Sequence, residues 1–206
     1  MVVDWINYDS SPHLILSRHQ NLKKLLYSLR VIPKQMYETS WPYKIIRRIN
    51  LLKGIPLDDE TVDFIYCSHF VEHLTHKDVI KLLKDCYRIL MPGGWIRVIC
   101  PDLRIITSKY LEGNTEYVLF KSKKSDLSHA FIKSLLLSAN RSFLERIFFS
   151  SNLHCCMYDY NSLSSLLSKC GFACIKKRQY KEGITPDINQ LDSRPEESLF
   201  VEAQKL

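Results

Sequence analysis

The sequences DFIYCSHFVEHL at residues 63–74 and MPGGWIRVICPD at residues 91–102 decide the fold of this chain. Residues 62–67 are a short apolar run rich in β-branched and aromatic side chains, which is typical of a strand buried on both faces of a parallel sheet. Residues 95–100 repeat the pattern. We therefore predict two buried strands with a helix between them.

The segment between these strands carries the signals of a helix. Thr75 can cap its first turn, with Asp78 three residues on as a variant of the capping box. Proline and two glycines at 92–94 are expected to end the helix, because proline disfavours helical geometry in the preceding residue and glycine accepts positive φ angles. Apolar residues at helical spacing predict one buried face, made of Val79, Leu82, Leu83, Cys86, Ile89 and Leu90.

Strand, helix and strand of these lengths make a right-handed βαβ unit. Ligands of such sheets bind outside the carboxyl ends of the strands. The residues at or just beyond those ends are the first candidates for a functional site: Ser68, His69, Glu72, His73 and Asp102.

These motifs resemble a known family. The pattern D-x-I-Y-x-S-H-x-x-E-H-L, followed one helix later by Y-R-x-L-x-P-G-G-x-x-R-x-x-x-P-D-L, is similar to the small class I S-adenosylmethionine-dependent methyltransferases found among glycan and cell-envelope genes. Other parts of the chain also resemble family segments, namely residues 5–12, 53–58, 154–158, 163–172 and 194–202. The resemblance implies an α/β fold, with a doubly wound, mainly parallel, Rossmann-like sheet and an antiparallel last strand, in a single domain of residues 1–206.

The chain departs from the family at its first strand. That family strand is central in the sheet and ends in a Gly-x-Gly turn, whereas here no glycine lies before Gly54. We therefore expect a sheet without its first strand, which would leave unpaired backbone donors and acceptors on either side of the gap. Three explanations stay open: the sheet closes the gap, the start codon has been assigned too late, or the gene is degenerate.

The resemblance implies S-adenosylmethionine as the cofactor and indicates where it would bind. Asp9, at the end of the second family strand, would accept hydrogen bonds from the ribose hydroxyls, although Asp9 could instead form a turn or cap. Asn50 stands where the family has an acidic residue for the adenine amino group, and Leu51 could flank the ring. Ser68 and His69 would line the methionine end.

Methyl transfer needs positioning of the two reactants and, for a hydroxyl or amine acceptor, a base. His73 is the predicted base, and Asp102 and His154 are further catalytic candidates. His73 could equally be a packed structural histidine, and Asp102 could cap the following helix. The predicted function is methyl transfer to a small-molecule or glycan-related acceptor. The alternative is a catalytically inactive module of the same fold that acts as a basic, membrane-peripheral or partner-binding protein.

The net charge of +7 is concentrated in one part of the chain. Between Pro12 and Asp58 there are nine Lys or Arg residues and a single acidic residue, Glu38. Within this basic crossover region, residues 13–53, a leucine stripe over 13–30 predicts an amphipathic helix. Such a helix can contact an anionic membrane or a phosphorylated substrate, or it can pack its leucines on the sheet with its lysines in water. Nucleic acid is less favoured, because no recognised nucleic-acid module accompanies the charge.

The remaining features narrow the class of protein. Residues 113–150 are predicted to form a helical insertion, either a lid that selects substrate or surface decoration. Seven cysteines suit reduced thiols in the cytoplasm, and the adjacent Cys155 and Cys156 make poor zinc partners, so no metal site is predicted. No apolar run approaches the roughly 20 residues that span a bilayer, and the polar start speaks against a signal peptide. The composition indicates no oligomeric state.

Overall fold

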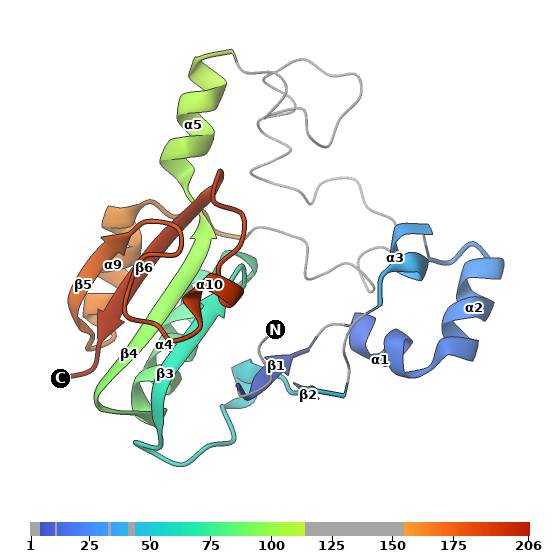
Figure 1. Ribbon diagram of the computed structural model, residues 1–206, viewed down its shortest axis with the longest axis horizontal. Helices are drawn as coiled ribbons and strands as arrows, with labels where there is room; N and C mark the ends of the chain where they lie inside the picture. The colour runs from blue at the N-terminus through green and yellow to red at the C-terminus, as the bar shows by residue number, and fades with distance from the viewer. Residues whose placement is uncertain (1–4, 11, 33, 41–43, 114–154) are drawn as a thin grey trace. The chain divides into compact units, whose positions relative to one another are not determined.

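The computed structural model describes residues 5–10, 12–32, 34–40, 44–113 and 155–206. These residues form two compact units, which divide after Gly54 (Figure 1). The single-domain organisation of residues 1–206 stays a prediction. His154 and the predicted lid, apart from Gly113, lie outside the described residues.

The described residues of the first unit form a two-stranded sheet, three short α-helices and one 3-10 helix. Strands β1 (Asn7–Asp9) and β2 (Ile46–Arg48) are parallel, with Asn7 opposite Ile46 and Asp9 opposite Arg48. The chain between them forms α1 (Pro12–Arg18), α2 (Gln20–Ser28) and α3 (Lys34–Glu38), and the 3-10 helix η1 (Leu51–Lys53) follows β2. The unit therefore has the strand, helix and parallel strand order of a crossover connection.

The second unit is built on a four-stranded sheet with the order β3-β4-β6-β5. The strands are β3 (Val62–Ser68), β4 (Leu90–Pro101), β5 (Ala173–Arg178) and β6 (Ser198–Gln204). β3 and β4 run parallel, whereas β6 is antiparallel to both β4 and β5. This confirms the predicted antiparallel last strand, and the four-stranded sheet is mixed rather than mainly parallel.

Helices cover both faces of this sheet. In Figure 1, α4 (His76–Ile89) and α9 (Tyr160–Lys169) lie behind it and α10 (Ile188–Leu191) lies in front. The helix α5 (Leu103–Leu111) follows β4, and the 3-10 helix η2 (Val71–His73) follows β3. The completely buried apolar side chains come from η2, α4, β4, α9 and β6 and form the core: Val71, Val79, Leu83, Leu90, Ile96, Val98, Ile99, Cys100, Leu163, Leu167, Leu199, Val201 and Ala203.

The predicted start and buried face of α4 are confirmed. Thr75 is the N-cap, and its hydroxyl oxygen accepts a hydrogen bond from the Asp78 backbone N–H at 3.3 Å. The buried residues of α4 are five of those predicted from the helical spacing, and the sixth, Leu90, is buried at the start of β4. The local sequence therefore decides where this helix begins and which side packs on the sheet.

The predicted end of α4 is wrong. The helix ends at Ile89, and Leu90 is already extended, so Pro92, Gly93 and Gly94 lie inside β4 instead of stopping the helix. They form an irregularity in the strand pairing between the Val62–Leu90 pair and the next pair. Gly93 has a φ angle of 84°, and a Cβ atom on Gly94 would lie 2.8 Å from the Met91 carbonyl oxygen, so both glycines serve this distortion.

Within the described residues, β1 and β2 form one sheet and β3, β4, β5 and β6 form another. The expectation that the sheet lacks its first strand stays a prediction, and so do the three explanations for that departure.

Candidate functional site

The carboxyl ends of β1 and β2 carry three of the predicted cofactor residues. Asp9 ends β1, and its backbone oxygen accepts a hydrogen bond from the Ile49 N–H at 3.2 Å. Asn50 follows β2, and its side-chain oxygen accepts from the Leu52 N–H at 3.0 Å, which caps η1. Leu51 is the first, half-buried residue of η1. As predicted, Asp9 and Asn50 lie at the same edge of a parallel pair.

The carboxyl end of β3 carries Ser68 and His69. Ser68 is the last residue of β3 and lies opposite Ile99, and the His69 backbone N–H donates to the Ile99 oxygen at 2.8 Å. His69 has a φ angle of 49°, in the left-handed region that a non-glycine residue adopts only at a cost. The turn into η2 therefore begins at a strained histidine.

Both ring nitrogens of His69 have partners inside the protein. Its Nδ1 lies 3.2 Å from Glu72 Oε1, and its Nε2 lies 3.1 Å from Ser198 Oγ, at the start of β6. With Glu72 ionised, Nδ1 carries the proton and donates to the carboxylate, and Nε2 accepts from the serine hydroxyl. This chain of carboxylate, imidazole and hydroxyl fixes the orientation of His69.

Glu72 is the buried centre of this end of the sheet. Its side chain is 1% exposed, and while Oε1 faces His69, Oε2 has no hydrogen-bond partner among the described residues. The Glu72 backbone oxygen accepts hydrogen bonds from the N–H groups of Cys155 at 2.7 Å and Cys156 at 3.1 Å. A buried carboxylate oxygen that lacks a donor is costly, so it would be stabilised by a donor from a bound molecule.

The thiols and the phenol near Glu72 stay neutral at ordinary pH. Burial, together with the Glu72 charge, raises the pKa of the Cys67 thiol to about 12. The same two causes, burial first, raise the pKa of Cys100 well above its usual value. Burial and then the nearby Cys156 raise the pKa of the Tyr158 hydroxyl. Thiolate chemistry is therefore disfavoured at Cys67 and Cys100.

His73 and Glu72 are neighbours in η2 whose side chains differ in exposure. The His73 side chain is 18% exposed, and its Nε2 lies 3.8 Å from Glu72 Oε1, beyond hydrogen-bond length. The predicted base therefore has access to the surface, whereas the carboxylate beside it does not.

Asp102 has the capping role that the sequence left open. It is 1% exposed, and its Oδ1 accepts from the Arg104 N–H at 2.9 Å at the start of α5. Its Oδ2 accepts from Lys177 Nζ at 3.2 Å. Both carboxylate oxygens of this catalytic candidate are thus engaged by the protein itself.

The predicted site residues fall into two groups. Asp9, Asn50 and Leu51 belong to the first unit, whereas Ser68, His69, His73 and Asp102 belong to the second. Each group lies at the carboxyl edge of its own parallel strand pair. Their roles in binding or catalysis stay predictions.

Sequence reasoning missed two features at this end of the sheet, the contact of Ser198 with His69 and the burial of the Glu72 side chain. Ser198 reaches His69 from a position 129 residues away in the sequence, and no local pattern marks it. Glu72 was visible as an acidic residue between two histidines, but nothing in the motif indicated that its side chain is buried.

A second buried polar network lies on β4 and was also missed. Arg97 is fully buried and uses all five of its N–H donors. Nε and Nη2 contact Asp192 at 3.0 and 2.6 Å, Nη1 contacts Glu202 at 3.2 Å, and the remaining bonds go to backbone oxygens of Gln179 and Glu182. The sequence did mark this residue, because Arg97 is the one charged residue in the otherwise apolar run 95–100, and a charge in a buried strand needs partners. This network ties residues 179–192 to the sheet.

The described residues contain no group of three or more His, Cys, Asp or Glu side chains arranged to hold a metal ion. In the same part of the chain, none of the helices has the length and apolar character needed to cross a bilayer.

The described residues have an α/β architecture with polar candidate residues at two strand edges. The family model described as a methyltransferase domain matches residues 29–98, about a third of the chain. This match spans β2, β3, α4 and most of β4, and it confirms the resemblance to a methyltransferase domain over those residues. The link to glycan and cell-envelope genes stays a prediction.

Solved structures with a similar arrangement include several methyltransferases. An S-adenosylmethionine-dependent methyltransferase from Archaeoglobus fulgidus is 16% identical, with a TM-score of 0.45, over 90% of this chain and 81% of that one. A possible histamine N-methyltransferase from Thermotoga maritima is 17% identical, with a TM-score of 0.45, over 94% and 93% of the two chains.

Another similar structure, a possible exported protein from Bordetella parapertussis, is 12% identical with a TM-score of 0.45; the match covers 96% of this chain and 52% of that one. The present chain therefore spans about half the length of that relative. Comparison with curated proteins gives no match.

Proposed function

We propose that the protein transfers a methyl group from S-adenosylmethionine to a small-molecule or glycan-related acceptor. The observation that carries this proposal is the parallel register of the two strand pairs, β1 with β2 and β3 with β4. In each pair the polar candidates follow the carboxyl ends of the strands, where α/β sheets of this kind bind ligands. The acceptor class rests on the motif resemblance alone.

The residues at the β1–β2 edge suit the adenosine half of the cofactor. The Asp9 carboxylate would accept hydrogen bonds from the ribose hydroxyls, and Leu51 would flank the adenine ring. The Asn50 side-chain oxygen already accepts from Leu52, but a carbonyl oxygen has two lone pairs and would also accept from the adenine amino group.

The residues at the β3–β4 edge suit the methionine half only in part. Ser68 and His69, at the carboxyl end of β3, would line it. The sequence has no glycine before Gly54, and so it lacks a glycine turn that would bring backbone donors close to the carboxypropyl group. We therefore expect the 206-residue chain to bind S-adenosylmethionine more weakly than micromolar, which calorimetry measures directly.

His73 is the proposed base for a hydroxyl or amine acceptor. When bound, the cofactor supplies an electrophilic methyl group. His73 would take the proton of the acceptor, and Glu72, 3.8 Å away, would offset the positive charge that forms on the imidazole. Asp102 and His154 are the further catalytic candidates; for Asp102, the cap and the ion pair favour a structural role.

Two substitutions distinguish binding from catalysis. Asp9→Ala should weaken cofactor binding by about 1–3 kcal/mol, the usual size for losing a charge-assisted acceptor. His73→Ala should lower turnover with little change in cofactor affinity, because a base acts on the acceptor. Equal losses of cofactor affinity in both variants would identify His73 as a packing residue, and no loss in either would remove the proposed site.

A second candidate is a catalytically inactive module of the same fold, and the absence of glycine before Gly54 favours it. The two candidates separate when cofactor binding is measured for the 206-residue chain and for the same chain extended by an N-terminal strand with a Gly-x-Gly turn. Binding restored by the extension supports the methyltransferase. If neither protein binds, the inactive module is the better description. Tight binding by the unextended chain would contradict the glycine argument.

We also propose that the protein works in the cytoplasm. All seven cysteines are free thiols, and Cys86 and Cys100 are buried in the core. Free thiols persist in a reducing compartment. Formation of disulfides in protein purified from cells under thiol-blocking conditions would contradict this location.

A further inference from the structure

Helix α2 presents apolar side chains to the surface. Leu22, Leu25 and Leu29 are 42%, 54% and 62% exposed. Their spacing of three and four residues puts them on one face of the helix. The sequence left open whether the leucines of this region pack on the sheet or contact a membrane, and these three are exposed.

The three helices hold together without these leucines. Leu16, Ile32 and Met36 form a small buried core, and Leu26, Val31 and Tyr37 pack against it. Tyr27 also stacks on Tyr37, with ring centres 4.3 Å apart. Because the inner side of the helices is already filled, the exposed leucines need another explanation.

Lys23 shows that the usual pattern is inverted. It is 3% exposed, its Nζ donates to the Thr39 backbone oxygen at 2.6 Å, and it lies 5.9 Å from the centre of the Tyr37 ring. A helix that simply covers a soluble core has its leucines inside and its lysines in water. Here a lysine is inside and three leucines are outside.

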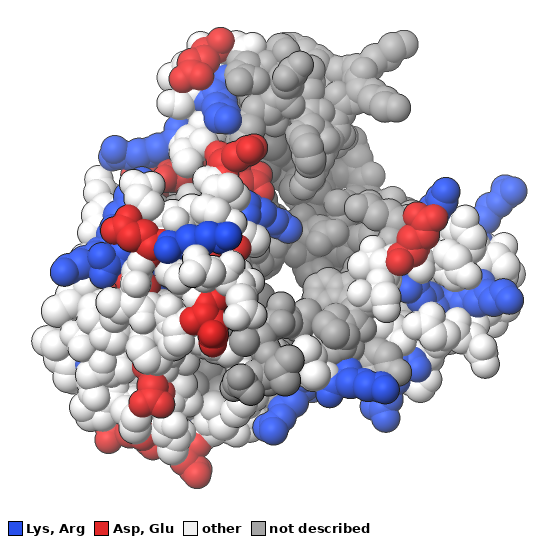
Figure 2. Space-filling model, viewed as in Figure 1, with Lys and Arg blue, Asp and Glu red and all other residues white. Residues whose placement is uncertain are grey.

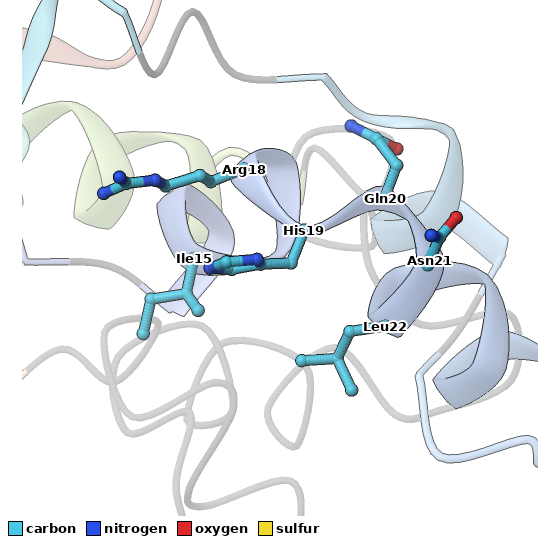
Figure 3. Close-up of a pocket in the computed structure, with 6 residues that line it drawn as sticks. All are labelled: Ile15, Arg18, His19, Gln20, Asn21 and Leu22. Atoms are coloured by element: carbon cyan, nitrogen blue, oxygen red, sulfur yellow. The ribbon is translucent and has the colours of Figure 1, made fainter.

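The corner between α1 and α2 extends the apolar face. An open hollow of about 680 Å³ lies there, lined by Ile15, Arg18, His19, Gln20, Asn21 and Leu22. Figure 3 shows Ile15, His19 and Leu22 projecting to the same side of the corner. Ile15 lies on α1 and Leu22 on α2, so apolar side chains of both helices line this hollow.

The charge around this face is of one sign. Arg18, Lys24 and Arg30 are exposed on α1, on α2 and just beyond α2. The sequence contains no acidic residue between Asp9 and Glu38. In Figure 2, blue side chains predominate over the part of the molecule formed by α1–α3 and β2. The leucines are therefore flanked by cations with few local carboxylates to neutralise them.

We propose that this surface, hereafter the α1–α2 face (Arg18, Leu22, Lys24, Leu25, Leu29 and Arg30), binds the surface of a bilayer that contains anionic lipids. The leucines would enter the region between headgroups and acyl chains, and the cations would pair with lipid phosphates and carboxylates. An aqueous macromolecule such as nucleic acid would use the cations and leave the leucines in water. The proposal is independent of methyl transfer, because none of the proposed site residues belongs to the α1–α2 face.

Vesicle co-sedimentation of the full chain tests the proposal. The protein should bind vesicles of phosphatidylcholine with a minority of phosphatidylserine and should bind pure phosphatidylcholine weakly, with a marked loss at high salt. The double substitution Arg18→Gln and Lys24→Gln should weaken binding about 30-fold, since each basic residue near an anionic surface contributes about fivefold. Leu25→Gln with Leu29→Gln should weaken it by at least about tenfold.

Matched controls decide between a local face and general basic charge. Lys84→Gln with Lys169→Gln removes two exposed cations from α4 and α9 and should leave vesicle binding unchanged. All variants replace exposed side chains, so their thermal midpoints should match the parent protein. Equal weakening by this control pair, or equal binding to neutral vesicles, would overturn the proposal. So would duplex DNA binding that needs Arg18 and Lys24 but not the leucines, in the absence of vesicle binding.

Discussion

Replacing Arg97 with methionine should destabilise the second unit severely. Methionine keeps much of the length of the side chain but removes its charge and all five donors. Asp192 and Glu202, both fully buried, would each lose a charge-assisted partner. Removing one member of a buried ion pair costs about 3–5 kcal/mol, because the remaining charge stays buried.

The surviving partners limit this loss. Glu202 would keep its contact with Arg178 at 2.8 Å and the hydrogen bond from the Thr185 hydroxyl at 2.8 Å. Asp192 would keep the hydrogen bond from the Lys181 N–H at 2.8 Å. We therefore expect a loss within that range of about 3–5 kcal/mol and not above it, which is a large part of the stability of about 5–15 kcal/mol typical of a domain.

Urea unfolding followed by circular dichroism measures the effect. Arg104→Met is the matched control, because Arg104 also faces a carboxylate, Asp159 at 3.5 Å, but is 68% exposed. An exposed pair of this kind contributes about 0–1 kcal/mol. If Arg97→Met does not fold, Arg97→Met with Asp192→Leu should recover folded protein, because it removes the buried unpaired carboxylate as well. A loss for Arg97→Met no greater than that for Arg104→Met would refute the reasoning.

Three further predictions concern local features. Burial alone would raise the pKa of Glu202, but hydrogen bonds from Thr185, Ile184 and Arg178 outweigh burial and hold that pKa below its usual value. The ionised carboxylate therefore stabilises the fold above the pKa of the unfolded state, and this stabilisation is lost as the pH falls through the folded-state pKa. Glu202→Gln should accordingly flatten the dependence of the free energy of unfolding on pH at the acid side. An unchanged slope would contradict this assignment. Gly183→Ala would press a methyl group against the Glu202 carboxylate and should lower the free energy of unfolding by about 1–3 kcal/mol. The loss should exceed that of the control Gly93→Ala, because Gly93 also has a positive φ angle but has open space around it. Equal losses in the two variants would mean that backbone strain explains the whole effect. Thr75→Ala removes the N-cap of α4 and should lower the free energy of unfolding by about 0.5–2 kcal/mol, and an unaltered urea midpoint would speak against the cap.

The strand, helix and strand from β3 to β4 were predictable because the sequence patterns that mark them are local. The Thr75 cap and the buried face of α4 depend only on residues within a few turns of one another. The end of α4 was not predictable, because the conformation of Gly93 and Gly94 depends on the pairing of β4 with β3. The preference of glycine and proline for helix ends takes no account of strand pairing.

The site was predictable only as far as strand ends could be placed. Asp9, Asn50, Ser68 and His69 follow the ends of buried or β-rich runs, and the structure has them at those ends. The contact of His69 with Ser198, and that of Arg97 with Asp192 95 residues away, depend on tertiary folding and leave no periodic signal. The exposure of the α2 leucines was likewise hidden, because an amphipathic pattern does not say which side faces water.

The Arg97 network also determines how the segment between β5 and β6 opens. The carboxylates that hold Arg97 also accept hydrogen bonds from the backbone amides of Lys181, Ile184 and Thr185. These amides exchange with solvent only when their hydrogen bonds to the carboxylates break. The Arg97 guanidinium holds those carboxylates in place. In native-state hydrogen exchange the three amides should therefore exchange together, through one opening event shared with the interior of β4 and β6, and not one by one as in an ordinary surface loop.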